Sequence, residues 1–102
     1  MDLNNKIISG IQSIARRYPI NRIVLFGSRA RGDNRNNSDI DLAVFPAPEF
    51  NSTGHFSSDV EDLETLLKVD LVFVDEYAEV ALLERIQREG VVLYERLSGE
   101  ID

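Results

Sequence analysis

A glycine–serine pair and two aspartates stand close together in this chain of 102 residues. Ten residues separate Ser28 from Asp39, and Asp41 follows two positions later, while Gly27 precedes the serine. A small-residue turn lets the backbone approach a phosphate, and Ser28 can donate from both its N–H and its hydroxyl. Two carboxylates can hold a divalent cation. The spacing therefore predicts a site for a nucleotide and a metal ion.

The two aspartates fall in an alternating apolar segment that predicts a strand. Asp39 and Asp41 would point to the same face, with Cα atoms about 6.6 Å apart. Ile40, Leu42 and Val44 would point to the opposite face and anchor the strand in the core. Mg²⁺ is usually held by one or two carboxylates together with water and substrate phosphates, so we expect an incomplete protein cage.

Asp70 is the natural third carboxylate, because it interrupts an otherwise apolar segment. Leu71 and Phe73 can join the core while Asp70 faces away from it. A carboxylate near the start of a buried strand costs free energy unless it is paired, hydrated or bound to metal. We expect a two-ion Mg²⁺ site in which Asp39 and Asp41 bridge the ions and Asp70 binds the ion that activates the acceptor hydroxyl. The alternative is a strand-entry residue that is hydrogen-bonded to backbone.

Arginines cluster beside the Gly-Ser turn, although the chain as a whole carries a formal net charge of −7. A local group of guanidinium ions suits a compact polyanion such as the triphosphate of ATP. Arg29 or Arg31 would neutralise that charge, and the sequence does not distinguish between them. For Arg16 and Arg17 we expect a solvated helix end instead.

The overall composition disfavours several other classes of protein. The acidic net charge argues against a dedicated nucleic-acid binder. The absence of cysteine excludes disulfides and zinc–thiolate sites and fits the reducing cytoplasm, where we expect the protein to act. No apolar run is long enough to cross a membrane, and we expect no secretory signal at the N-terminus.

Apolar spacing and turn residues predict helices and strands in alternation, which is an α/β layer arrangement. The expected helices cover residues 2–17, 29–31, 59–68 and 76–89, and the expected strands cover residues 21–26, 39–45, 69–74 and 91–94. Ser58 and Glu61 form a capping-box pattern for the third helix, after a flexible connection, and Asp75 is expected to cap the last helix. We expect one domain over residues 1–97 and a flexible tail at 98–102.

Residues 27–41 resemble the signature of the DNA polymerase beta nucleotidyltransferase superfamily, and more narrowly that of the minimal nucleotidyltransferase (MNT) domain proteins. Residues 68–72 resemble the third-carboxylate strand of that family, and residues 86–94 resemble its C-terminal end. The resemblance covers nearly the whole chain. It implies a palm-like nucleotidyltransferase fold, with a small mixed sheet and helices packed mainly on one face.

Members of this family often act as antitoxins beside a HEPN-domain ribonuclease. The resemblance implies transfer of AMP from ATP to a tyrosine of that toxin, with Mg²⁺ as the cofactor. The implied catalytic metal ligands are Asp39, Asp41 and Asp70, and the implied nucleotide-binding residues are Gly27, Ser28, Arg29 and Arg31.

Two alternatives remain open at this point. The first is a non-catalytic antitoxin that neutralises a HEPN partner by complex formation. A single lobe would leave the aspartate-bearing sheet face uncovered, with Ala43, Phe45, Val72 and Val74 on it, and such a face favours a partner or a homodimer. The second is a small-molecule nucleotidyltransferase, which is less favoured because such enzymes usually carry a second lobe with the acceptor pocket.

Overall fold

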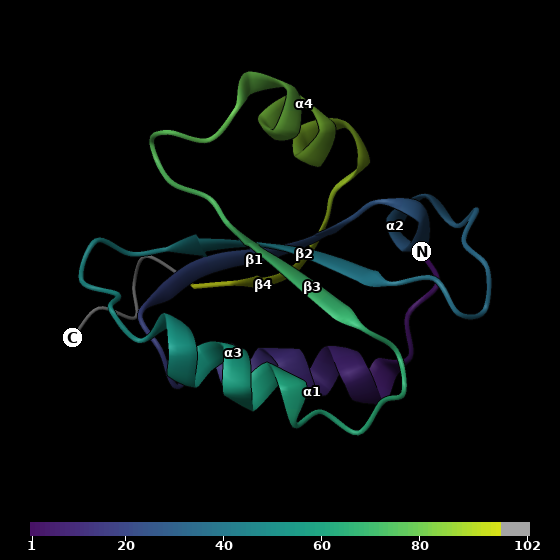
Figure 1. The fold of residues 1–102 in the computed structure, drawn as a ribbon, viewed down its shortest axis with the longest axis horizontal. Helices are drawn as coiled ribbons and strands as arrows, with labels where there is room; N and C mark the ends of the chain where they lie inside the picture. The colour runs from purple at the N-terminus through teal and green to yellow at the C-terminus, as the bar shows by residue number, and fades with distance from the viewer. Residues whose placement is uncertain (97–102) are drawn as a thin grey trace.

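The computed structural model describes residues 1–96, so the tail expected at 98–102 lies outside the described residues. A four-stranded sheet separates helices α1 and α3 on one face from α4 on the other (Figure 1). The helices are α1 (Asn5–Ala15), α2 (Ser28–Arg31), α3 (Thr53–Glu61) and α4 (Val80–Glu89), and the strands are β1 (Ile20–Phe26), β2 (Ile40–Pro46), β3 (Val69–Phe73) and β4 (Val91–Glu95). No helix in the described part of the chain is long and apolar enough to span a membrane.

The strand order is β3-β2-β1-β4, and the sheet is mixed. Strand β1 runs antiparallel to β2 and β4, whereas β2 and β3 are parallel. Parallel neighbours need a crossover connection, which α3 provides here. The end of β1 and the starts of β2 and β3 therefore meet at one edge of the sheet, which confirms the predicted mixed α/β class.

The main core lies between the sheet and helices α1 and α3. Ile40, Leu42 and Val44 are fully buried there, as the alternation of β2 predicts. Leu71 and Phe73 of β3 pack against the same core, so Asp70 lies on the opposite face.

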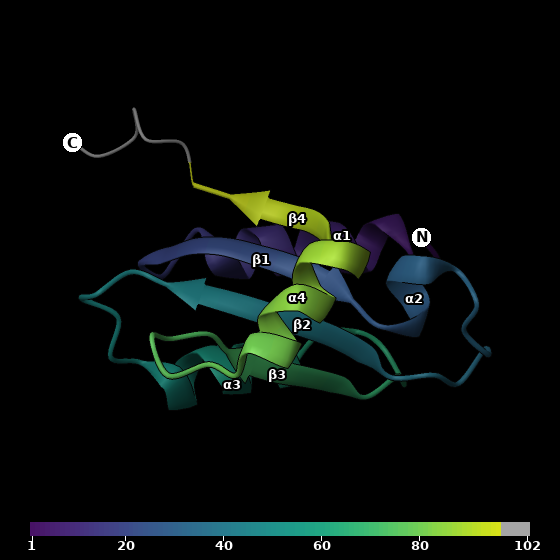
Figure 2. The same ribbon diagram turned by 90° about the horizontal axis from the view of Figure 1, so that it is seen from above.

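A second, smaller core lies on the aspartate-bearing face. Ile86 of α4 is buried there against a cluster that includes Val24, Phe26 and Ala43. Figure 2 shows α4 lying across the strands on this side. The expectation that this face is uncovered is therefore wrong in part, because the chain after β3 folds back over the sheet and buries Ala43 completely.

Helix α3 begins at Thr53, six residues before the predicted start at 59, so Ser58 lies inside the helix rather than at its N-cap. Ser52 precedes the helix and makes no side-chain cap hydrogen bond. The earlier start lets the helix bury both Phe56 and Val60, which stand four positions apart on its inner side. Burial of an aromatic ring outweighs a capping box, which contributes about 1 kcal/mol.

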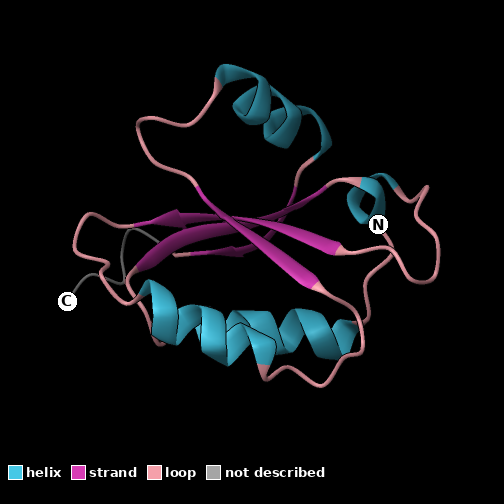
Figure 3. Cartoon of the chain, in the orientation of Figure 1, coloured by secondary structure: helices cyan, strands magenta, loops and turns pink. Residues whose placement is uncertain are grey.

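Helix α4 begins at Val80 rather than at residue 76 (Figure 3). Asp75 does not cap the helix but accepts a hydrogen bond from the N–H of Tyr77 at 2.8 Å, which forms a local turn. The residues after β3 are thus a loop, and Val80 remains 69% exposed. The predicted end of the helix at Gly90 is confirmed.

Candidate active site

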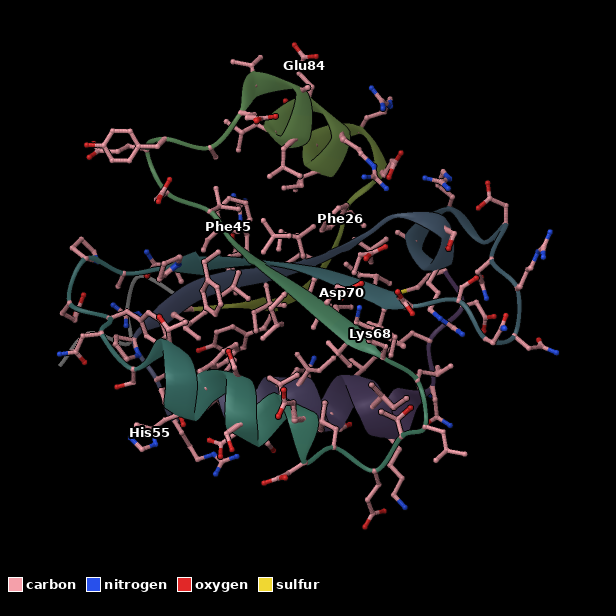
Figure 4. The ribbon with its side chains drawn as sticks, viewed as in Figure 1. Phe26, Phe45, His55, Lys68, Asp70 and Glu84 are labelled. Carbon is pink, nitrogen blue, oxygen red and sulfur yellow. The ribbon has the colours of Figure 1, made fainter. Side chains whose placement is uncertain are left out.

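The predicted carboxylates and the phosphate turn lie at one edge of the sheet, where the end of β1 meets the starts of β2 and β3. Asp41 and Asp70 are direct partners in the parallel ladder of β2 and β3, and Phe26 is the partner of Asp41 in β1. Neighbouring strands lie about 4.8 Å apart, so the two carboxylates stand side by side on one face. Figure 4 shows Asp70 near the start of β3, at the end of the sheet where α2 lies.

Asp41 is partly buried and sits in a negative field. Its pKa is raised, first by burial and then by the charges of Asp70 and Asp39, while Arg85 and Arg31 act in the opposite direction. The ionised form of Asp41 is therefore less stable here than in water. A bound cation would relieve this repulsion.

Lys68 supplies a cation to this edge that the sequence interpretation missed. Its ammonium group lies 3.2 Å from Oδ1 of Asp70, and this contact raises the pKa of Lys68. The available signal was the spacing of two positions, because Lys68 directly precedes β3 and alternation along extended chain places its side chain on the same face as that of Asp70. Asp39 precedes β2, which begins at Ile40 rather than at 39, and its side chain is exposed.

Within residues 1–96, no three or more His, Cys, Asp or Glu side chains lie close enough together to hold a metal ion by themselves. In this described part of the chain, side chains alone therefore form no complete cage. The donor set nevertheless fits Mg²⁺, which typically takes one or two carboxylates and completes its shell with water and phosphate oxygens. The adjacent oxygen ligands Asp41 and Asp70, with Asp39 contributing to their negative field, meet that requirement.

The turn between β1 and α2 requires glycine. Gly27 has a φ of 81°, and a Cβ at this position would collide with the carboxylate of Asp41. The backbone of the turn thus lies directly against the candidate metal ligand. Ser28 begins α2, and Gly32, with a φ of 87°, follows its last residue in the left-handed conformation, so the helix ends at residue 31 as predicted.

The two candidate arginines of α2 have different surroundings. Arg29 is 5% exposed, and its guanidinium donates to the backbone carbonyls of Ser38, Asn36 and Asp2 at 3.0, 3.0 and 3.2 Å. Arg29 therefore links the loop before β2 to the N-terminal segment through hydrogen bonds. The side chain of Arg31 is 40% exposed, and it lies beside the turn.

Glu89, at the end of α4, is a site residue that sequence reasoning did not identify. Its Oε1 accepts the N–H of Gly27 at 3.0 Å, and its Oε2 lies 2.9 Å from Nη1 of Arg31. Burial raises the pKa of this carboxyl. The hydrogen bond from Gly27 and the charges of Arg31 and Arg85 lower the pKa by more than burial raises it, so the net pKa is depressed. Nothing in the sequence pattern pointed from α4 to the turn.

Comparisons with known proteins identify the family of this chain. A family model described as Polymerase beta, Nucleotidyltransferase matches residues 9–98. A protein of Methanocaldococcus jannaschii, whose name marks it as a candidate protein adenylyltransferase, is 37% identical over 78 residues, and the match covers 66% of this chain and 78% of the relative.

Two solved structures share the fold. One is a toxin–antitoxin complex with AMP-PNP, in which the matching chain has a TM-score of 0.65 and 25% identity over 90% of this chain and 76% of its own length. The other is a tri-AMPylated Shewanella oneidensis HEPN toxin in complex with an MNT antitoxin, with a TM-score of 0.61 and 22% identity over 92% of this chain and 74% of that one. The second likeness is one of fold alone. Because the family model spans most of its length, this chain belongs to the polymerase beta nucleotidyltransferase family.

Proposed function

We propose that this protein is a Mg²⁺-dependent antitoxin that transfers AMP from ATP to a tyrosine hydroxyl of a HEPN-domain toxin. The observation that carries the proposal is the register that sets Asp41 beside Asp70 and against the Gly27 turn. A phosphate-binding turn and a pair of metal-binding carboxylates within contact of each other are what nucleotidyl transfer requires. The family gives the class of reaction.

Different residues of the site bind the nucleotide and the acceptor. Gly27 and Ser28 receive the triphosphate, and Arg31, which unlike Arg29 is partly exposed beside the turn, neutralises its charge. Mg²⁺ bound by Asp41 and Asp70 would stabilise negative charge on the phosphates and lower the pKa of the acceptor hydroxyl.

Asp70 is assigned to the acceptor side, because β3 is an edge strand and leaves its start accessible to a partner. The exposed Asp39 adds its negative charge to this edge of the sheet. The tyrosine oxygen bonds to the α-phosphorus, the bond to the β-phosphate oxygen breaks, and diphosphate leaves. The hydroxyl proton passes to a carboxylate of the site.

A protein acceptor is supported by the apolar surface around α4 as well as by the relatives. Leu83 and Val92 are 37% and 51% exposed, and both line a cavity of about 400 Å³ between α4 and the sheet. The cavity lies on the face that carries Asp41, at the other end of the strands, where Arg22 and Phe45 also line it. A docked partner would cover this surface while it presents its tyrosine at the carboxylate edge.

The test is incubation of the purified protein with α-phosphate-labelled ATP, Mg²⁺ and the product of the neighbouring gene, which the proposal expects to be the HEPN protein. We expect label on the HEPN protein, and none when Asp41→Asn or Asp70→Asn replaces the wild type. Asp75→Asn is the matched control, because this exposed aspartate lies beyond the end of β3. Full labelling by an Asp39→Ala/Asp41→Ala double variant would show that the proposed site is wrong.

The exposed apolar surface also favours a second candidate, an antitoxin that acts by binding alone. In that case the Asp39→Ala/Asp41→Ala variant would still suppress toxicity when it is co-expressed with its partner. The enzymatic proposal expects toxicity to return.

A further inference from the structure

We infer that Glu89 is a positioning residue that holds the Gly27 turn and Arg31 in the geometry that receives the nucleotide triphosphate. The inference rests on the proposed function and extends the site to α4, outside the segment that carries the recognised motif. Glu89 lies 62 positions from Gly27 in the sequence, so the contact is purely tertiary.

Both oxygens of the Glu89 carboxylate have partners. One accepts the Gly27 N–H at 3.0 Å, and the other pairs with Arg31 at 2.9 Å. The side chain is only 10% exposed, and its other two cationic neighbours are more distant, with Arg85 at 3.4 Å and Arg88 at 3.9 Å. The contacts with Gly27 and Arg31 fix the orientation of the carboxylate and, through it, the turn.

Gly27 is thereby held from two sides. Its N–H is bound to Glu89, while its Cα lies so close to the carboxylate of Asp41 that no Cβ would fit. Glycine is the residue with the greatest backbone freedom, so a turn built on it has little rigidity of its own. The contact with Glu89 supplies that rigidity and sets the distance between the turn and the metal-binding edge.

Arg31 depends on Glu89 for its direction. Its other acidic partner is Asp33, at 3.1 Å, whose side chain is 62% exposed. Without Glu89, the guanidinium would pair with Asp33 alone and move toward solvent. Glu89 keeps Arg31 beside the turn, where a triphosphate would meet it.

The backbone that presents Glu89 is itself fixed. Ile86, one turn earlier on α4, is 5% exposed and packs in the smaller core with Val24 and Phe26. Arg85 stacks over the ring of Phe26, with 5.2 Å between guanidinium carbon and ring centre, and its Nε lies 3.4 Å from Oε1 of Glu89. The helix therefore cannot withdraw Glu89 without exposing apolar surface.

The experiment compares Glu89→Ala and Glu89→Gln with the wild type. AMP-PNP affinity is measured by titration calorimetry with Mg²⁺ present, and exchange of the Gly27 amide proton is measured by NMR. The matched control is Glu84→Gln, because Glu84 lies on the same helix and points away from the sheet (Figure 4). Circular dichroism and thermal melting establish that each variant is folded.

We expect Glu89→Ala to bind AMP-PNP about tenfold more weakly, as for the loss of one charge-assisted hydrogen bond, and to exchange the Gly27 amide faster. Glu89→Gln keeps an acceptor for the Gly27 N–H but has no charge to pair with Arg31. Its affinity for AMP-PNP should therefore lie between those of the wild type and Glu89→Ala. If Glu89→Ala fails to fold, Glu89→Gln alone decides, with wild-type affinity counting against the inference. Glu84→Gln should match the wild type.

A double-mutant cycle separates positioning from a general structural role. If Glu89 acts through Arg31, the penalties of Arg31→Ala and Glu89→Ala on affinity should sum to more than the penalty of the double variant. Additive penalties, or wild-type affinity in Glu89→Ala, would overturn the inference.

Tighter binding by Glu89→Ala would also overturn it, because Glu89 would then compete with phosphate for the Gly27 amide. A wild-type protein that binds AMP-PNP but labels no HEPN partner would contradict the proposed function alone. A wild-type protein that binds no AMP-PNP would contradict both.

Discussion

Asp41 and Asp70 are paired at the same level of two parallel strands, on the sheet face that α4 partly covers. The pairing arises because α3 crosses the opposite face and returns the chain parallel to β2. It places like charges together, and the pKa of Asp41 is raised through burial and through the charge of Asp70. The fold thus maintains an electrostatic conflict that a bound cation would resolve.

Because of this repulsion, we expect a substitution that increases stability at this site to reduce activity. Asp41→Asn removes one of the opposed charges, so we expect the melting temperature in EDTA to rise by a few degrees while AMP transfer is lost. Differential scanning fluorimetry and the labelling assay measure the two quantities. Asp75→Asn should change neither, and a lower melting temperature for Asp41→Asn would contradict the repulsion.

Gly27→Ala should be damaging and Gly54→Ala harmless. At Gly27 an alanine combines a φ of 81° with a collision against Asp41, so we expect a loss of about 1–3 kcal/mol in the free energy of unfolding and loss of transfer. At Gly54, inside α3, a Cβ would meet no atom within 4 Å, so alanine should stabilise the helix by about 0.5–1 kcal/mol. Urea denaturation measures both, and equal effects would refute the argument.

The two arginines of α2 should separate into structural and nucleotide-binding roles. Arg29→Ala removes a buried guanidinium from three backbone carbonyls, and we expect it to cost about 2–4 kcal/mol of folding free energy. Arg31→Ala should cost little stability but weaken AMP-PNP binding. Urea denaturation and calorimetry test the pair, and the reverse assignment would appear as weak binding by a fully stable Arg29→Ala.

Ionisation of Glu89 should make the free energy of unfolding depend on pH in the acid range. Because its pKa is depressed below the ordinary value of 4.5, its ionised form stabilises the fold above that pH, and the contribution is lost as the pH falls through the folded-state pKa. We therefore expect Glu89→Gln to be less stable than the wild type at neutral pH, and the difference to shrink as the pH falls below that ordinary value. Urea midpoints across this range measure it. A constant difference between Glu89→Gln and the wild type across this range would contradict the pairing of the carboxylate.

Lys68 should compete with metal for Asp70. The ammonium lies 3.2 Å from the carboxylate, so Lys68→Met should lower the Mg²⁺ concentration needed for half-maximal transfer. EDTA should abolish transfer in both proteins. The measurement is a Mg²⁺ titration of the labelling rate, with Lys6→Met as the control, because Lys6 lies on α1 and pairs with an exposed glutamate. A higher Mg²⁺ requirement in Lys68→Met would contradict competition.

Much of the fold follows from local patterns in the sequence. Alternation placed Ile40, Leu42 and Val44 in the core, and the structure confirms this. The glycines at 27 and 32 marked the ends of α2, because only glycine takes these backbone angles without strain. These features depend on neighbours within a few residues, so their signals are short and direct.

Other features depended on competition between signals. The capping-box pattern placed the start of α3 at 59, but burial of Phe56 among the rings of Tyr18, Phe50 and Phe73 moved it to Thr53. Propensity at a helix end contributes about 1 kcal/mol, and a buried aromatic ring contributes more. The partners of that ring lie on other elements, so the outcome was not visible locally.

The sequence by itself determined the turn, the carboxylates and the strands that carry them, because chain periodicity and backbone sterics act over a few residues. Only the tertiary structure decided that Asp70 stands beside Asp41, that Arg29 braces a loop, and that Glu89 holds the Gly27 turn. Each of these contacts joins elements that meet only after the helices have packed against the sheet. Their geometry is set by the burial of apolar surface across the whole chain, which no local pattern encodes.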